Sequence, residues 1–220
     1  MIKGDCSVQL RCSPFCERIV MWIYFVIMAV VVVLDQISKH IILRILPEEG
    51  MMLDIIPGVF RLNHLKNDGA AFGWFDDSRW VFILLTSVTI IAVVYYLVTR
   101  RPKDPWVFVP FSMIVGGGVG NMIDRLFYYE EGSSFGNGLV IDFFDFYAFP
   151  KLWHWIFNVA DSFVVVSAFI LFGYLLVGIL KDEKKKKGDV AVTEATKEVT
   201  EDVTEHTAEP SEEAQQDNEG

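Results

Sequence analysis

Four long apolar stretches, separated by polar segments, dominate the pattern of the chain. They cover about residues 19–46, 80–98, 106–123 and 159–180. A helix needs about 20 largely apolar residues to cross the hydrocarbon core of a bilayer. Pro47 ends the first stretch, and Pro110 falls early enough in the third to be tolerated in a helix. The pattern therefore predicts a mainly α-helical membrane protein with four transmembrane helices.

The two outer connections between these stretches are long and mixed in character. Residues 47–79 and 124–158 contain Gly, aromatic and acidic residues. Val59–Lys66 shows a partial alternation of apolar and polar positions, which is typical of a strand with one buried face. We expect a small extracytoplasmic region that contains β-structure at the membrane surface.

Basic residues predict the orientation of the chain. They gather before the first stretch, between the second and third, and after the fourth, as Lys3, Arg11 and Arg18, then Arg100, Arg101 and Lys103, then Lys181 and Lys184–Lys187. Loops rich in Lys and Arg stay on the cytoplasmic side of a membrane. We expect a cytoplasmic segment 1–18, a membrane domain 19–180 and a cytoplasmic segment 181–220, with both longer connections outside.

Composition agrees with a membrane protein and singles out the C-terminal segment. Hydrophobic residues make up 52% of the 220 positions, which excludes an ordinary soluble domain. The net charge is −10, and residues 188–220 hold all of that imbalance because they carry 11 acidic residues and one basic residue. An acidic segment with so little to bury predicts a disordered tail.

The three cysteines lie close together at the N-terminal end. Cys6, Cys12 and Cys16 precede the first apolar stretch, and their spacing fits no zinc motif well. On the cytoplasmic side they are expected to stay reduced. We predict no metal site and no cofactor.

Ionisable and amide side chains gather at the outer ends of the predicted helices. Ionisable groups in or beside a membrane span indicate a functional site by default. These residues are Asp35 in the first stretch, Asn121, Asp124 and Arg125 in the third, Asp142 in the second outer connection, and Asn158 and Asp161 at the start of the fourth.

Each of these residues also has a structural interpretation. Asp35 and Lys39 are four residues apart and could pair on one face of a helix. Asp124 could form an ion pair with its neighbour Arg125 at the helix end. Asn158 could be the N-cap of the fourth helix by accepting a backbone N–H, and Asp161 could be stabilised by the positive end of that helix.

Two further features favour structural roles. Gly116 and Gly120 have the spacing of a GxxxG motif, which indicates close packing of membrane helices. Asp142 could be a solvated loop residue, and for Asp145 this is the favoured interpretation.

The alternative is a catalytic role in which two aspartates hydrolyse a peptide bond. This role requires two carboxylates that face each other across that bond. One is ionised and takes a proton from water, whereas the other is protonated and donates to the scissile carbonyl. Spacing alone does not select the pair from the four aspartates Asp35, Asp124, Asp142 and Asp161.

Three other classes of protein are compatible with intramembrane carboxylates. A small transporter or proton channel would place them near the bilayer midplane in repeated halves, and the halves of this chain are not alike. A Ser–Lys peptidase using Ser38 and Lys39 is disfavoured because neighbours in sequence point to different faces of a helix. A membrane scaffold without catalytic activity is the third alternative.

Five motifs in order give the chain a family resemblance. The blocks "DQISKH", "KNDGAAFG", "GGGVGNMIDR", "VIDFFDF" and "FNVADS" occur between about residues 20 and 180. Together with four spans, they resemble lipoprotein signal peptidase, also called signal peptidase II. The resemblance implies an aspartic endopeptidase of the bacterial cytoplasmic membrane, inhibited by globomycin-type peptides. It would cleave diacylglyceryl-modified prolipoproteins before the lipidated Cys, near the outer face of the membrane.

The resemblance assigns roles to individual residues. It implies that Asp142 and Asp161 are the catalytic pair. The residues implied to bind substrate or support the site are Asp35, Lys39, Asn67, Gly69, Ala70, Phe72, Asn121, Asp124, Arg125 and Asn158. The expected partners are prolipoproteins and membrane lipid, with no nucleic acid and no required oligomer. The insertion-like segment at about 128–138 lies outside the motifs and lengthens the chain before Asp142.

Overall fold

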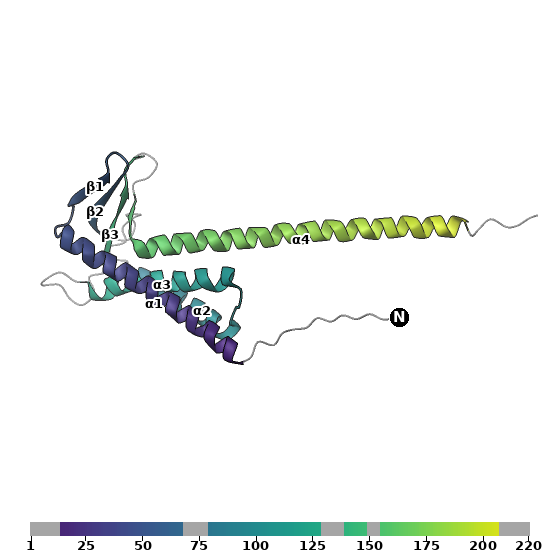
Figure 1. Ribbon diagram of the computed structural model, residues 1–220, viewed down its shortest axis with the longest axis horizontal. Coiled ribbons are helices and arrows are strands. Elements are labelled where there is room, and N and C mark those ends of the chain that lie inside the picture. Colours follow the sequence, from purple (N-terminus) through teal and green to yellow (C-terminus); the bar gives the residue numbers. More distant parts are fainter. Residues whose placement is uncertain (1–13, 68–78, 129–138, 149–154, 207–220) are drawn as a thin grey trace, which may run out of the picture. The chain divides into compact units, whose positions relative to one another are not determined.

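The computed structural model describes residues 14–67, 79–128, 139–148 and 155–206, with side chains between residues 18 and 184 (Figure 1). The elements in chain order are α1 (Pro14–Ile45), β1 (Met52–Ile56), β2 (Phe60–Asn67), α2 (Arg79–Arg100), α3 (Pro105–Phe127), β3 (Val140–Phe146), β4 (Ile156–Phe157) and α4 (Val159–His206). The chain divides into two compact units, Met1–Phe172 and Gly173–Gly220, and all of these strands belong to the first.

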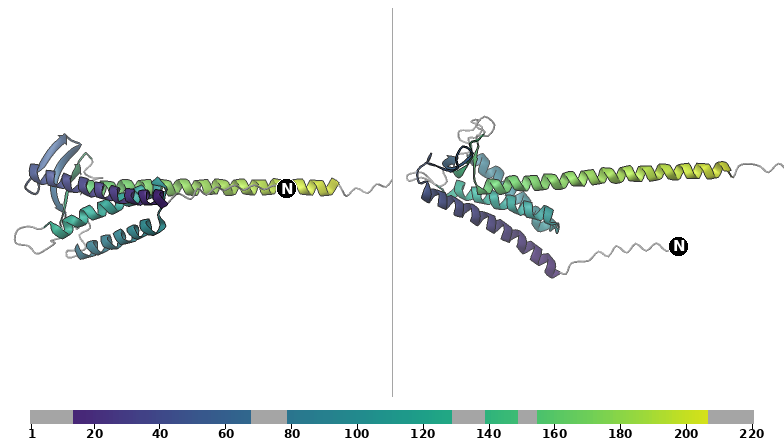
Figure 2. Two further views of the ribbon diagram at one scale, coloured as in Figure 1. Left: turned by 60° about the horizontal axis from the view of Figure 1, so that its bottom comes forward. Right: turned by 45° about the horizontal axis from the view of Figure 1, so that its top comes forward.

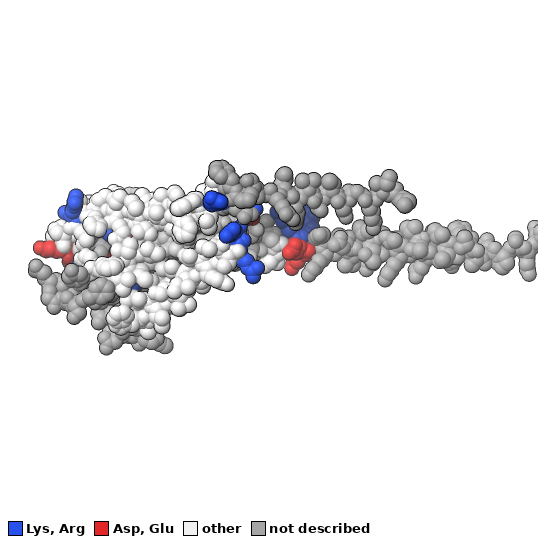
Figure 3. All heavy atoms as spheres, turned by 90° about the horizontal axis from the view of Figure 1, so that it is seen from below, with Lys and Arg blue, Asp and Glu red and all other residues white. Residues whose placement is uncertain are grey.

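Four helices are long and apolar enough to cross a membrane, as the sequence predicts. The candidate spans are Arg18–Ile45, Trp80–Arg100, Pro105–Phe127 and Val159–Lys184. Large apolar side chains on them are exposed, as expected for helices in contact with lipid. In the space-filling view, uncharged side chains cover the broad face of these helices and the coloured charges gather towards its ends (Figure 3).

Helix α3 packs against both α1 and α2 (Figures 1 and 2). Glycine allows the close approach between α3 and α1. A Cβ atom added at Gly116 would lie only 2.7 Å from Cβ of Val31, so any larger residue would push the two helices apart. The predicted packing role of the Gly116–Gly120 segment is therefore confirmed.

The strands form one antiparallel sheet in the order β1-β2-β3-β4. Strand β2 confirms that Val59–Lys66 contributes a strand, although burial does not alternate along it. The register between β2 and β3 shifts between Leu62 and Leu65, and Leu65 is opposite Asp142. Apolar contacts attach the sheet to the helices, because Ile141 and Phe143 of β3 form a buried cluster with Ile42 of α1.

The C-terminal segment differs from the prediction. Helix α4 continues to His206, so the expectation of disorder is wrong for residues 188–206. A helix is costly to nucleate but cheap to extend, and the membrane span already supplies the nucleus. No Gly or Pro occurs between Gly188 and Pro210 to end it. Residues 207–220 lie outside the described part of the chain.

Candidate active site

Asp142 lies in strand β3 with its side chain 1% exposed, so it is not a solvated loop residue. Asn67, at the end of β2, donates a hydrogen bond of 2.7 Å from Nδ2 to Asp142 Oδ2. Asn158 donates a second hydrogen bond of 2.7 Å from Nδ2 to Asp142 Oδ1. Each carboxylate oxygen of Asp142 therefore accepts an amide N–H from a different segment of the chain.

Asp161 lies in the first turn of α4 and is bonded reciprocally to Asn158. The side-chain oxygen of Asn158 accepts the Asp161 backbone N–H at 3.0 Å. The Asn158 backbone N–H donates to Asp161 Oδ2 at 3.3 Å. This arrangement is a capping box, and it confirms Asn158 as the N-cap of the fourth helix. It also holds the Asp161 carboxylate at the positive end of the helix dipole.

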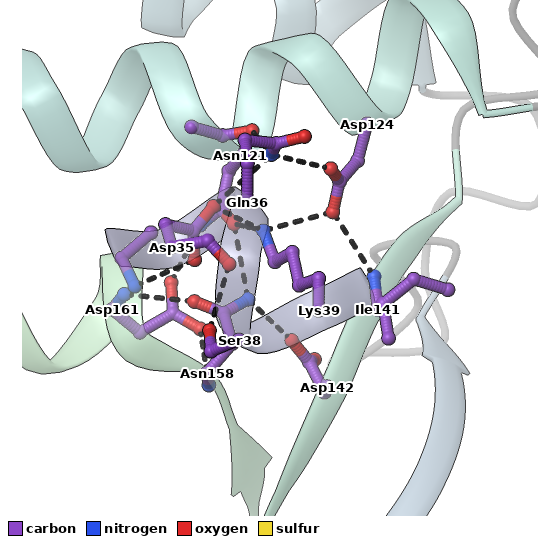
Figure 4. Close-up of polar contacts among 12 residues, drawn as sticks. Asp35, Gln36, Ser38, Lys39, Asn121, Asp124, Ile141, Asp142, Asn158 and Asp161 are labelled. Carbon is purple, nitrogen blue, oxygen red and sulfur yellow. Dashed lines mark hydrogen bonds and ion pairs between the residues drawn. The ribbon is translucent and has the colours of Figure 1, made fainter. Parts of the chain in front are cut away.

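Asn158 connects the two aspartates that the resemblance implies to be catalytic (Figure 4). Its side chain is fully buried. Its Nδ2 group donates to Asp142, whereas its backbone N–H donates to Asp161. Asn158 thus joins Asp142 and Asp161, an arrangement that spacing in the sequence could not reveal.

Asn121 of α3 bonds the opposite oxygen of Asp161. Its Nδ2 group donates to Asp161 Oδ1 at 2.7 Å. Its Oδ1 atom accepts two hydrogen bonds, from Asn158 Nδ2 at 3.0 Å and from Lys39 Nζ at 2.9 Å. The amide of Asn121 therefore lies between Asp161 and the cation of α1.

Lys39 is the centre of a buried ion triad. Its ammonium lies 2.7 Å from Asp35 Oδ2 and 2.8 Å from Asp124 Oδ2, with all three side chains nearly inaccessible. The predicted pair of Asp35 and Lys39 is confirmed. Asp124 was expected to pair with its neighbour Arg125, but the structure gives it Lys39 as an ion-pair partner instead.

The ion triad joins α1 and α3 to the start of α4. Asp35 Oδ1 accepts the backbone N–H of Ala160, in the first turn of α4, at 2.9 Å. A Cβ atom at Gly120 of α3 would lie 2.6 Å from Asp35 Oδ2, so glycine is needed there for the carboxylate to fit. Gln36 Nε2 donates to Asp124 Oδ1 at 2.9 Å and to the Gly120 carbonyl at 3.1 Å.

Burial first, and the neighbouring Asp161 carboxylate second, raise the pKa of Asp142 to about 7. The amide hydrogen bonds from Asn67 and Asn158 act in the opposite direction but are outweighed. Two carboxylates close together cannot both ionise cheaply. Near neutral pH, the site is therefore suited to a pair that shares one proton.

Of the remaining predicted site residues, the structure describes only Arg125. The Arg125 guanidinium lies 5.2 Å from the ring centroid of Phe82. Gly69, Ala70 and Phe72 fall outside the described residues.

Two other sequence hypotheses can be compared with the structure. Ser38 Oγ donates to the Asp35 carbonyl at 2.7 Å, whereas Lys39 Nζ bonds other groups, so the structure does not pair them as nucleophile and base. The expectation that Asp145 is solvated is wrong. Its carboxylate is buried, and it accepts a hydrogen bond of 2.7 Å from Arg61 in β2.

Three contributors to the site were not predicted from the sequence. Ala160 and Ile141 donate backbone N–H groups, to Asp35 and Asp124 respectively. Their side chains carry no signal of that role. Gln36 directly follows Asp35 in the "DQISKH" block, which was the one available indication. In the part of the chain that the structure describes, no group of three or more His, Cys, Asp or Glu residues is arranged to hold a metal ion.

Fold and site together define a multi-pass membrane protein with a buried carboxylate and amide cluster near one end of its helices. A family model described as signal peptidase (SPase) II matches residues 27–177. The chain therefore belongs to the signal peptidase II family.

Individual relatives cover most of the chain. The lipoprotein signal peptidase of Brevibacillus brevis is 38% identical over 168 residues, which are 76% of this chain and 100% of the relative. That of Caldanaerobacter subterraneus is 39% identical over 152 residues, 69% of this chain and 94% of the relative. A bacterial membrane enzyme solved in meso at 2.3 Å resolution aligns with a TM-score of 0.58 and 28% identity, covering 73% of this chain and 88% of its own.

Proposed function

We propose that the chain is a membrane aspartic endopeptidase that removes signal peptides from diacylglyceryl-modified prolipoproteins. The cut falls immediately before the lipidated Cys. Membership of the signal peptidase II family supports the substrate class. The buried pair of Asp142 and Asp161 supports the aspartic mechanism, since it is the kind of site that such chemistry requires.

The observation that carries the mechanism is the connection of both carboxylates through Asn158. One residue bonds Asp142 with its side chain and Asp161 with its backbone, which fixes the two acids relative to each other. The pKa of about 7 for Asp142, caused first by burial, leaves a large share of this acid protonated at neutral pH and most of it protonated below neutral pH. Asp142 is then the general acid, and Asp161 is the general base.

The reaction uses these two groups in sequence. Asp161 takes a proton from water as the water oxygen attacks the scissile carbonyl carbon, and Asp142 donates its proton to the carbonyl oxygen. The tetrahedral intermediate then collapses. Asp161 passes its proton to the leaving amine as the C–N bond breaks, and a hydroxyl of the intermediate returns a proton to Asp142. Both aspartates end in the states in which they began.

The position of the site suits a substrate that lies in the membrane. The three Lys and Arg clusters favour a cytoplasmic location for both termini, so the outer ends of α1 and α3 and the start of α4 lie near the outer face. A signal peptide is a membrane helix whose cleavage site emerges at that face. A pair of acids at this depth meets the scissile bond without moving it through the bilayer.

The test is cleavage of a defined substrate by the purified chain. A synthetic prolipoprotein peptide carrying a diacylglyceryl Cys is incubated with the protein in lipid nanodiscs, and the products are identified by mass. We expect a single cut before the modified Cys, inhibited by a globomycin-type peptide. The same peptide with an unmodified Cys is the matched control and should stay intact. If the folded protein leaves the lipidated peptide intact, or cuts both peptides alike, the proposal is wrong.

A further inference from the structure

We propose that Lys39 is a positioning residue of the peptidase: by bonding Asn121, it determines which end of that amide faces Asp161. The inference rests on the proposed function and adds a named role for a residue that touches neither catalytic aspartate through any hydrogen bond described above. Its basis is the chain of contacts from Lys39 Nζ to Asn121 Oδ1 at 2.9 Å and from Asn121 Nδ2 to Asp161 Oδ1 at 2.7 Å.

The chemistry of the ammonium makes this orientation unambiguous. An amide has a donating end and an accepting end, whereas a lysine ammonium only donates. The end of Asn121 that faces Lys39 must therefore be the carbonyl oxygen, which leaves the NH₂ group for Asp161. Asn158 also donates to Asn121 Oδ1, and it is held in that orientation because its own Oδ1 accepts the Asp161 backbone N–H. Of the two donors to Asn121 Oδ1, Lys39 is the charged one, and it has no accepting end that could face the amide.

The orientation of Asn121 decides how the proton of the pair is placed. With the NH₂ group towards Asp161, the Asp161 oxygen accepts a hydrogen bond, which suits a carboxylate acting as general base. With the amide reversed, a carbonyl oxygen would face the Asp161 oxygen, and only a protonated Asp161 could bond it. The reversed amide would thus move the shared proton from Asp142 to Asp161 and exchange their roles.

Lys39 is held firmly enough to impose this orientation. Its side chain is 2% exposed, and its three N–H donors match three acceptors, on Asp35, Asp124 and Asn121. If Lys39 served only as an ion bridge between α1 and α3, contacts with Asp35 and Asp124 would be enough, and the third hydrogen bond to Asn121 would not be needed. Besides Lys39, the charged groups that act on Asp161 are Arg125 from α3 and, across the pair, Asp142 from β3.

The experiment is a double-mutant cycle between Lys39→Met and Asn121→Ala, read as kcat and KM on the lipidated peptide. If Lys39 acts through Asn121, each single change lowers kcat by about tenfold or more, and the two together cost no more than about twofold beyond the worse single change. KM should stay within about twofold throughout, because neither group is proposed to contact the substrate. Effects on kcat that multiply would show that Lys39 acts independently of Asn121, and the proposal would be wrong.

The cycle is repeated with Asp124→Asn in every chain, because Lys39→Met alone leaves two buried carboxylates without their cation. In the Lys39→Met chain, Asp124→Asn restores the original net charge of the triad. In the chain that keeps Lys39, the side-chain oxygen of the new asparagine can still accept a hydrogen bond from the ammonium. The folded fraction of each variant is measured by size-exclusion chromatography and thermal unfolding. If Lys39→Met fails to fold in both backgrounds, or if Asp124→Asn restores its kcat, then Lys39 is a structural or charge-balancing residue.

A spectroscopic readout separates this inference from the proposed function. In chains labelled with ¹⁵N-asparagine, the side-chain NH₂ resonance of Asn121 should shift when Asp161→Asn changes its hydrogen-bond partner. The same change in a Lys39→Met background should move it much less, because the NH₂ group is no longer directed at residue 161. This result does not depend on cleavage. A chain that cuts no lipidated peptide would refute the proposed function, whereas equal shifts in both backgrounds would refute the role of Lys39.

Discussion

The side-chain amide of Asn158 donates a hydrogen bond of 2.7 Å to Asp142, while Asn158 is also the N-cap of the helix that carries Asp161. One residue therefore sets the start of α4 and the geometry of the two acids. The structural and the proposed catalytic role reside in different atoms. The Oδ1 atom caps the helix, and the Nδ2 group bonds Asp142, so substitutions can separate them.

Asn158→Ser should keep the N-cap of α4 and lose the side-chain hydrogen bond to Asp142 that links the two acids. Serine is a good N-cap residue, but its short hydroxyl offers no NH₂ group to reach Asp142. We expect near-normal thermal stability and a loss of kcat of about tenfold or more. Asn158→Ala is the matched variant that loses both, and it should also be less stable by about 1 kcal/mol. Thermal unfolding in detergent and cleavage of the lipidated peptide measure the two effects. Normal turnover of the Ser variant would remove the bridge from the mechanism.

Asp142→Asn and Asp161→Asn should each abolish cleavage while leaving the folded protein in the membrane. Each change removes a general acid or base, and such groups contribute about 10²–10⁴-fold to rate. Because the pair works as a unit, the double variant should be no slower than either single variant. Single-turnover assays with the lipidated peptide measure the loss. Asp145→Asn is a control on the same strand and should retain most of the activity.

The stability of the protein should depend on pH through Asp142. Its pKa in the folded state, about 7, lies above its ordinary value of 3.8, mainly because burial disfavours the charged form. The stability that the neutral carboxyl provides is fully present below about pH 4, falls as the pH rises, and is gone above about pH 7. Asp142→Asn, which cannot ionise, should therefore raise the melting temperature at pH 8 by a few degrees.

The same substitution should have little effect on stability at pH 4, where the native carboxyl is already neutral. Melting temperatures of both chains are compared across pH 4–8 in one detergent, with Asp145→Asn as a second reference. A stabilisation that is the same at both ends of this range would show that the charge of Asp142 is not its cause.

Hydropathy was sufficient to predict the four helices, because a single apolar segment of about 20 residues can bond all its backbone groups within itself only as a helix. It could not choose among four aspartates at the same depth. That choice depends on strand β3 placing Asp142 beside the N-cap of α4, and no local pattern encodes it. The assignment of Asp142 and Asp161 from the sequence came from family resemblance and stays a prediction, and the structure adds that Asn158 bonds both residues.

The errors also have physical causes. Asp145 is buried because Arg61, 84 positions earlier in the chain, becomes its neighbour through the pairing of β2 with β3. Asp124 pairs with Lys39 and not with its neighbour Arg125 as predicted, because the close packing of α1 on the glycines of α3 brings the Lys39 ammonium next to it. The acidic segment after Gly188 begins as a helix because a helix already precedes it. In each case, a contact or a neighbour outside the local window decided the outcome.

Gly120→Ala should be strongly damaging, whereas Gly118→Ala should be tolerated. A methyl group at position 120 would lie 2.6 Å from Asp35 Oδ2, inside the ion triad, where little can move. At position 118, the nearest atoms are side-chain carbons of Ile90 at 3.4 Å, an ordinary contact. Alanine favours a helix over glycine by up to about 1 kcal/mol, so Gly118→Ala should be neutral or slightly stabilising. Yield of folded protein and melting temperature test the difference; equal outcomes would argue against the tight fit at Gly120.

The orientation of the chain can be tested by labelling cysteines in intact cells with a membrane-impermeant maleimide. Met52, in β1, is 53% exposed and should face outwards with the rest of the sheet. Met52→Cys should therefore react in intact cells, whereas Lys103→Cys, in the basic connection between α2 and α3, should react only after lysis.

The native cysteines should behave like Lys103→Cys if the N-terminal segment is cytoplasmic. A parent chain that keeps Cys6, Cys12 and Cys16 should therefore remain unlabelled until the cells are opened. All three Lys and Arg clusters favour the same side of the membrane, so an inverted chain would place all three on the unfavoured side. If the parent chain is labelled from outside and Met52→Cys adds no further reaction, the orientation is inverted. The two acids would then lie at the cytoplasmic face, where a cleavage site emerging on the outer side could not reach them.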